Sequence, residues 1–155
     1  MTPPPPFQSF IEAYADDVWR FLSASVGPSE ADDCWQETFI AALRAYPRLQ
    51  PDSNLKAWIL KIAQRKAIDS HRSTTRRPLP IERVPDVPTK SSAEGSPDLW
   101  ESVRALPHKQ RLAVVYRYAS DLRYADIAEL LDCSVEAARR SVHEGLKKLR
   151  EEWTP

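Results

Sequence analysis

A cluster of prolines in the middle of the chain constrains the fold more than any other feature. Residues 78–97 hold five prolines among 20 residues. Proline lacks an amide hydrogen and clashes with the preceding helical turn, so this stretch cannot continue a helix and is expected to be extended or disordered. It divides the 155-residue chain into two parts, each long enough for a small helical module with a modest core.

Both parts are expected to be helical, because the chain has only three glycines and few runs alternate apolar with polar residues. The N-terminal part predicts three or four helices. The first has a shared apolar face, the second is capped by Ser29, and the third begins near Leu55 and runs towards Arg72. The second helix has an expected buried stripe of Ala31, Trp35, Phe39, Ala42 and Leu43. Trp58 lies on the apolar stripe of the third helix, which favours a core position.

The C-terminal part predicts a helix-turn-helix. Residues 124–131 have apolar side chains at helical spacing, and Asp132 and Cys133 supply a tight turn. Aspartate adopts left-handed backbone conformations better than most residues, and Ser134 is a suitable N-cap for the next helix. The fold prediction is therefore all-α: two small helical modules, residues 7–77 and 99–153, joined by a Pro-rich flexible linker of residues 78–98.

The second helix of this motif is amphipathic and basic. Its apolar stripe is Ala138, Val142, Leu146 and Leu149, and its other face carries Glu136, Arg140, His143, Glu144 and Lys147. An exposed basic helix held across a partner helix by a short turn fits the major groove of DNA. The alternative is an ordinary helical hairpin with a solvated charged face.

Charge is distributed unevenly, although the formal net charge is zero. Residues 1–43 contain seven acids and one base, Arg20, whereas residues 61–77 contain six bases and one acid, Asp69. Residues 139–150 contain five bases and one acid, Glu144. One acidic surface and two basic ones indicate two kinds of partner, a protein with basic patches and a polyanion.

Several functional classes find no support in the sequence. There is no Gly-rich phosphate loop, metal-ligand spacing or nucleophile with a nearby base, so we expect no enzyme, cofactor, metal ion or small-molecule substrate. Cys34 and Cys133 are far apart in sequence and are expected to be buried small side chains, with a redox switch as the alternative. No signal peptide or transmembrane run is apparent, so we expect a cytoplasmic protein without membrane contacts.

Three segments together resemble a known family. Residues 30–39, EADDCWQETF, look like the acidic helix of region 2.2 in bacterial sigma factors, and residues 57–69, AWILKIAQRKAID, are similar to regions 2.3 and 2.4. Residues 106–111, LPHKQR, followed by residues 124–149, look like region 4. The two modules without a region-3 domain resemble the extracytoplasmic-function (group IV) class.

The resemblance implies an alternative sigma factor that binds core RNA polymerase and directs promoter-specific transcription initiation. Region 2.2 would dock on the β′ clamp of the polymerase through Asp33, Gln36 and Glu37. Regions 2.3 and 2.4 would melt and read the minus-ten promoter element through Lys61, Arg65, Lys66 and Arg72. Region 4 would bind the minus-thirty-five element through Tyr124, Arg139, Arg140, His143 and Lys147. The family also implies an anti-sigma factor as a partner.

The chain departs from the family pattern at several positions. Arg65 stands where many relatives carry an Asn that helps hold a flipped base, and Asp132 replaces the usual turn glycine. Glu136 and Glu144 lie on the expected DNA-facing side, so we expect weak unaided DNA binding and an unusual minus-thirty-five sequence. Two other classes remain open: a stand-alone helix-turn-helix regulator, and a sigma-like protein that sequesters polymerase or an anti-sigma factor.

Overall fold

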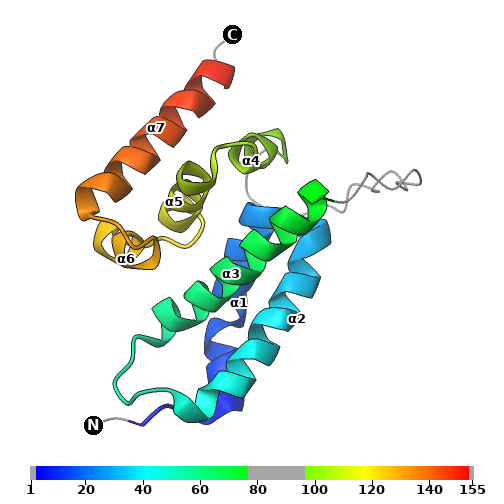
Figure 1. The fold of residues 1–155 in the computed structure, drawn as a ribbon, viewed down its shortest axis with the longest axis vertical. Coiled ribbons are helices and arrows are strands. Elements are labelled where there is room, and N and C mark those ends of the chain that lie inside the picture. The colour runs from blue at the N-terminus through cyan, green and yellow to red at the C-terminus, as the bar shows by residue number, and fades with distance from the viewer. Residues whose placement is uncertain (1–2, 77–96, 154–155) are drawn as a thin grey trace.

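The computed structural model describes the backbone of residues 3–76 and 97–153, and the side chains of residues 3–70 and 99–152. Within these ranges the regular structure is helical, as the sequence predicts (Figure 1). The expected linker, residues 78–98, falls almost wholly outside the described residues. The helices are α1 (Phe7–Val26), α2 (Pro28–Ala45), a 3-10 turn η1 (Tyr46–Arg48), α3 (Leu55–Arg76), α4 (Pro97–Arg104), α5 (His108–Tyr118), α6 (Tyr124–Leu130) and α7 (Val135–Trp153).

Helices α1, α2 and α3 pack against one another as the first group of helices. Phe10 is fully buried at one end of this group, and its ring centroid lies 5.2 Å from Tyr14, 5.3 Å from Tyr46 and 5.7 Å from Trp58. Rings at these separations and tilts attract through their quadrupoles in addition to the area they bury. Trp58 thus contributes to the core, which confirms the sequence expectation.

The start of α2 differs from the prediction. Ser29 is not the N-cap, because the helix begins at Pro28 and Gly27 occupies the cap position with a φ of 89°. Glycine adopts this left-handed region without strain, and proline at the first helical position has no amide hydrogen that needs a partner. At the start of α3, by contrast, the Asn54 side chain accepts a hydrogen bond from the Ala57 amide at 3.1 Å.

The buried stripe of α2 is narrower than predicted. Ala31, Phe39 and Ala42 are buried, and Trp35 is half-buried with its indole N–H donating to the Ala15 carbonyl at 3.0 Å. Leu43 is 56 % exposed, so its assignment to the core was wrong. Successive residues of a helix are 100° apart, which places Leu43 beyond the edge of the face that these four residues already fill.

The second group of helices is built around α5, α6 and α7, which pack together. The turn between α6 and α7 is as predicted: Asp132 has a φ of 53°, and the Ser134 hydroxyl accepts a hydrogen bond from the Ala137 amide at 3.0 Å. On α7, Ala138, Val142 and Leu149 are buried and Leu146 is half-buried. Gly145 is also buried, where α7 approaches α5.

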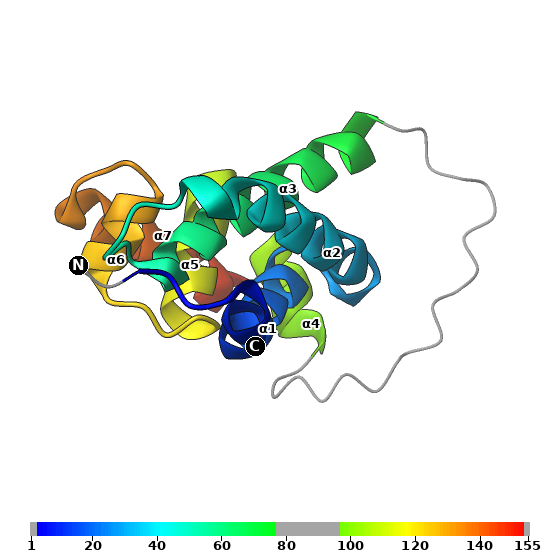
Figure 2. The ribbon, with the colours of Figure 1, turned by 90° about the horizontal axis from the view of Figure 1, so that it is seen from below.

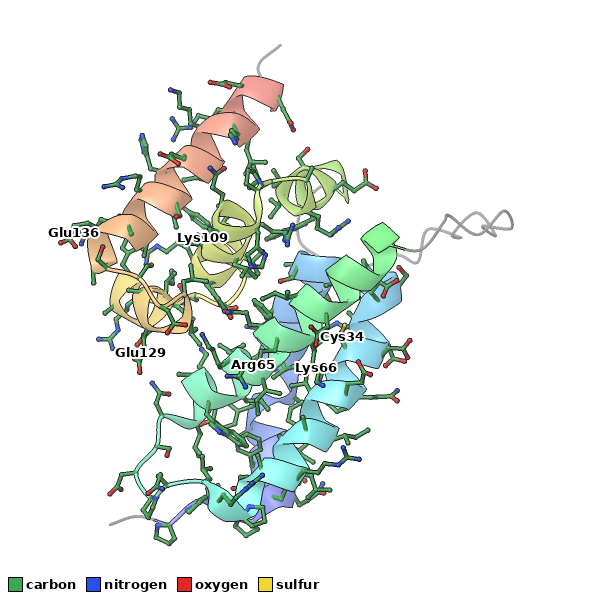
Figure 3. The ribbon with its side chains drawn as sticks, in the orientation of Figure 1. Cys34, Arg65, Lys66, Lys109, Glu129 and Glu136 are labelled. Carbon is green, nitrogen blue, oxygen red and sulfur yellow. The ribbon has the colours of Figure 1, made fainter. Side chains whose placement is uncertain are left out.

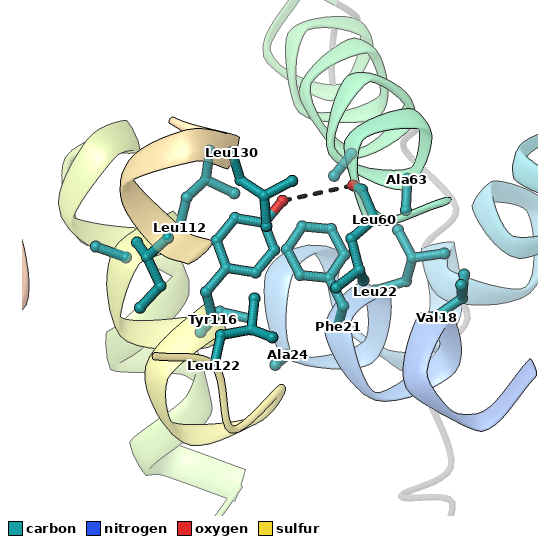
Figure 4. Close-up of a cluster of buried hydrophobic side chains, with 14 of the residues drawn as sticks. Val18, Phe21, Leu22, Ala24, Leu60, Ala63, Leu112, Tyr116, Leu122 and Leu130 are labelled. Carbon is teal, nitrogen blue, oxygen red and sulfur yellow. Dashed lines mark hydrogen bonds between the residues drawn. The ribbon is translucent and has the colours of Figure 1, made fainter. Parts of the chain in front are cut away.

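The two groups of helices are packed onto each other around one continuous cluster of buried residues (Figures 2 and 4). Helix α1 packs on α4 and α5, and α3 packs on α6. Tyr116 of α5 is fully buried at this junction, and its ring is stacked on Phe21 of α1 with centroids 4.7 Å apart. The two predicted helical modules are thus present, and their buried residues form one shared core among the described residues.

Candidate functional site

The outward face of α7 carries the charged residues predicted for DNA binding. Arg140, His143 and Lys147 are all exposed, and they recur at helical spacing on the side opposite the buried stripe. Glu136 is exposed at the N-terminal end of the same helix (Figure 3), where the helix dipole favours a negative charge. The face is therefore basic along most of its length and acidic at its first turn.

An aromatic side chain fixes two guanidinium groups beside this face. The Cζ atoms of Arg117 and Arg139 lie 4.4 and 5.3 Å from the ring centroid of Tyr124. Arg117 also donates a hydrogen bond to the Leu122 carbonyl at 3.0 Å. The structure thus brings together the predicted Tyr124 and Arg139, and adds Arg117. Sequence reasoning missed Arg117, because only the folded path of residues 119–123 brings α5 beside the first residue of α6.

Glu144 lies at the edge of the face next to α5. Its carboxylate accepts a hydrogen bond of 3.4 Å from the Gln110 side-chain amide, although Glu144 itself is exposed. Lys147 and Arg140 lie closer to the middle of the outward face. Glu144 therefore places a negative charge beside the basic residues of α7.

The basic residues of α3 have different environments. Arg65 is exposed and Lys66 is half-buried (Figure 3), whereas Arg72 lies within α3 but its side chain is outside the described residues. The Lys61 side chain is 29 % exposed and donates to the Leu130 carbonyl at 2.6 Å and to the Asp132 carboxylate at 3.1 Å. Lys61, predicted to bind the minus-ten element, therefore contacts the end of α6 and the turn that follows it.

The acidic side of the molecule is on α2. Asp33, Gln36 and Glu37 are all exposed, and Ile40, one turn further along, is 51 % exposed. Helix α2 packs on α1, α3 and η1. In both Figure 1 and Figure 2 it lies away from α6 and α7. The acidic surface and the basic face of α7 therefore belong to different sides of the molecule.

Known protein families match both halves of the chain. The family model for sigma-70 region 2 matches residues 10–77, and the model for sigma-70 region 4 matches residues 97–149. The chain is 33 % identical over 141 residues to the ECF RNA polymerase sigma factor SigC of Mycobacterium tuberculosis, covering 87 % of this chain and 76 % of that protein. This chain belongs to the ECF sigma factors. It is an alternative sigma factor, a regulatory protein of transcription initiation.

A further relative is more distant from this chain in sequence, and two solved structures have a similar fold. The ECF RNA polymerase sigma-E factor of Haemophilus influenzae is 25 % identical over 167 residues, covering 96 % of this chain and 88 % of that protein. The structure of the sigma factor RpoE from Bartonella quintana, solved with the anti-sigma factor NepR, matches with a TM-score of 0.76, 22 % identity and 94 % coverage of both chains. CnrH, solved with the cytosolic domain of CnrY, matches with a TM-score of 0.69 and 18 % identity, covering 94 % of this chain and 85 % of that one.

The cysteines of this sigma factor lie in protected places. Burial raises the pKa of the Cys34 thiol. A hydrogen bond with the Ser70 side chain lowers this pKa, and the charges of neighbouring acids, Glu30 among them, raise it. Its Sγ donates to the Lys66 carbonyl at 3.8 Å, and Cys133 is half-buried.

In the described ranges, acidic, histidine and cysteine side chains form no group suited to a metal ion. None of the helices described is both long and apolar enough to cross a membrane.

Proposed function

We propose that this ECF sigma factor binds core RNA polymerase through the exposed face of α2 and then reads a promoter with α3 and α7. Residues 7–77 would act as region 2, residues 78–98 as the linker, and residues 99–153 as region 4. The observation that carries the proposal is the separation of charge: an exposed acidic face on α2, and an exposed basic face on α7, with the exposed Arg65 on α3 as a further cation. A polymerase clamp and a DNA duplex need such opposite surfaces.

The α2 face has the composition of a protein-binding surface. Asp33, Gln36 and Glu37 supply charge and hydrogen-bonding groups, and the 51 % exposed Ile40 supplies an apolar centre. Interfaces of this kind combine an apolar core, which loses its water, with a polar rim that sets orientation and association rate. In this proposal the partner surface is a basic coiled coil of the β′ clamp.

The DNA-binding roles follow from geometry and charge. On α7, Arg140 would contact a base edge, because arginine can donate two hydrogen bonds to guanine. Lys147 and His143 would contact phosphates, for which lysine acts as a point charge. Arg139, held against Tyr124, contributes a further cation at the same end of the motif. On α3, Lys61, Arg65, Lys66 and Arg72 would hold the backbone of the melted minus-ten strand.

A protein inhibitor is the remaining proposed partner. RpoE and CnrH, the two structures with similar folds, were each solved with a bound partner: the anti-sigma factor NepR for RpoE, and the cytosolic domain of CnrY for CnrH. We propose that this chain is likewise regulated by an anti-sigma factor.

Core binding is tested by co-elution of the purified chain with bacterial core RNA polymerase. We expect the wild type to co-elute and the double variant Asp33→Lys/Glu37→Lys to be lost from the complex. The matched control is Glu12→Lys/Asp16→Lys, which makes the same charge change at the same spacing on the exposed side of α1. A wild type that does not bind core, or a control that loses binding equally, would contradict the assignment of α2.

A further inference from the structure

Two arginines from different helices converge on the ring of Tyr124. The Cζ atom of Arg117, near the end of α5, lies 4.4 Å from the ring centroid, and that of Arg139 on α7 lies 5.3 Å from it. Both distances are within the range over which a guanidinium group is attracted to the face of an aromatic ring, roughly 6 Å. Tyr124, the first residue of α6, thus joins α5, α6 and α7 at one point.

The two arginines differ in exposure. Arg139 is exposed and is the neighbour of Arg140 on α7. Arg117 is half-buried, and its guanidinium group also donates a hydrogen bond to the Leu122 carbonyl at 3.0 Å. A planar guanidinium group can serve a carbonyl and a ring together, and the two contacts fix its position. Arg139 can therefore reach a phosphate, whereas Arg117 is committed to contacts within the protein.

The start of α6 depends on such a support. Arg123 occupies the N-cap position of α6, and its side chain makes no capping hydrogen bond but pairs with Asp126 at 3.4 Å. Serine, threonine, aspartate or asparagine at this position would hold the first helical turn through the side chain. Arg117 contacts the residues on both sides of the uncapped position, the carbonyl of Leu122 and the ring of Tyr124.

We infer that Arg117 is a positioning residue for DNA binding: it fixes the ring of Tyr124, and this ring orients the guanidinium group of Arg139 towards the DNA backbone. The inference rests on the proposed DNA-binding role of α7. Arg117 need not touch DNA in this arrangement, because its effect passes through the ring to Arg139.

Repulsion between the two guanidinium groups opposes this effect. Arginine is always charged in proteins, so removing Arg117 would also remove a like charge from the surroundings of Arg139. Because Arg139 is exposed, solvent and salt screen this repulsion and leave little of it. The loss of orientation is therefore the larger effect, and removing the guanidinium group of Arg117 should weaken DNA binding.

The orientation of Arg139 is measured by nuclear magnetic resonance on the free full chain. Protons above the face of an aromatic ring resonate upfield, so the δ-methylene protons of Arg139 should lie upfield of those of Arg140. We expect Arg117→Met to remove most of this difference, as Tyr124→Leu does. Methionine keeps an apolar stem of similar length and lacks the guanidinium group. An Arg139 signal that Arg117→Met leaves unchanged, or that is not shifted in the wild type, would overturn the inference.

A second variant covers the case in which Arg117→Met does not fold. Arg117→Lys retains the charge, but its ammonium group lacks the planar fork that serves the ring and the carbonyl together. We expect Arg117→Lys to reduce the upfield shift of Arg139 as well, with the helical circular dichroism of the wild type. A folded Arg117→Lys variant with the full shift would count against the inference in the same way.

The effect on DNA is measured by fluorescence anisotropy with a short mixed-sequence duplex at low salt. We expect Arg117→Met to weaken binding roughly two- to fivefold, the range that a cation–π contact at an exposed site allows. In an Arg139→Ala background the same change should have almost no effect. The matched control is Arg123→Met, which removes a charge next to Tyr124 from a side chain paired with Asp126. Its effect should be the same in both backgrounds.

The outcomes separate positioning from other roles of Arg117. Equal effects of Arg117→Met in both backgrounds would overturn the inference, because they would mean that Arg117 contacts DNA directly or only stabilises the fold. Tighter binding by Arg117→Met would also overturn it, since repulsion would then be the larger effect. A wild type that binds no duplex would contradict the proposed role of α7, and the resonance measurement, which involves no DNA, would still decide whether Arg117 orients Arg139.

Discussion

Substitution of Gly145 by alanine tests how closely α7 is packed on α5. A Cβ atom at this position would lie 2.8 Å from Cγ2 of Val114, whereas ordinary van der Waals contact begins at 3.4 Å. Leu106 and Gln110 are within 3.5 and 3.6 Å on the same side. Val114 is 3 % exposed and β-branched, so it has little freedom to turn away. The backbone of α7 must therefore shift, which displaces the proposed recognition helix.

The magnitude follows from two opposing effects. Overpacking a close-packed site costs about 1–3 kcal/mol. Replacing glycine by alanine within a helix recovers about 1 kcal/mol of backbone propensity. We therefore expect Gly145→Ala to lower the free energy of unfolding by about 1 kcal/mol, which for a chain of this size is about 2–4 °C in Tm.

The assay is urea unfolding followed by circular dichroism, in the wild type and in a Val114→Ala background. Removing Cγ2 of Val114 removes the clash, so in that background Gly145→Ala should become stabilising by about 1 kcal/mol. The reversal of sign identifies the contact. The same effect of Gly145→Ala in both backgrounds, or a full stabilisation in the wild type, would refute the close approach.

Three further outcomes follow from the described contacts. Ser134→Ala should lower stability by about 1 kcal/mol in urea unfolding, since it removes the cap of the Ala137 amide, and an unchanged midpoint would contradict that role. In binding to the cognate promoter, Lys147→Ala should reduce the slope of log affinity against log salt by about 0.9. Arg140→Ala should instead reduce the discrimination between bases at one position by about 1–3 kcal/mol. Identical effects of the two substitutions on salt dependence and on base preference would contradict these separate roles. Cys34, buried and with a raised thiol pKa, should react with iodoacetamide only on unfolding, as mass spectrometry of the labelled peptides can show; rapid labelling of the native protein would contradict its burial.

Local features of the fold could be predicted from the sequence. The turn at Asp132 and the cap at Ser134 depend on residues adjacent in the chain, and both have the predicted conformation. The prediction that Ser29 caps α2 was wrong, because Gly27 and Pro28 together start this helix two residues earlier. The prediction that Leu43 is buried was wrong because hydrophobic periodicity locates the centre of the buried stripe but not its width.

Long-range features could not be predicted. Lys61 and Asp132 are 71 residues apart in sequence, and Tyr116 and Gln64 are 52 apart. No local sequence pattern predicts such pairs, because they depend on how one group of helices packs on the other. Arg117 was missed for a more local reason: its partner, Tyr124, is only seven residues away, but the path of residues 119–123 between the two helices decides whether they meet. The residues proposed to bind polymerase and DNA remain predictions, supported by their exposure and charge.

Reconstituted transcription tests the central claim most directly. Core RNA polymerase would be combined with the purified chain on a DNA library with randomised upstream sequence, and the 5′ ends of the transcripts would be sequenced. The account predicts transcripts absent from core alone, from templates enriched in two sequence elements upstream of a defined start. Core binding without any such transcripts would contradict it, and would favour a protein that sequesters polymerase.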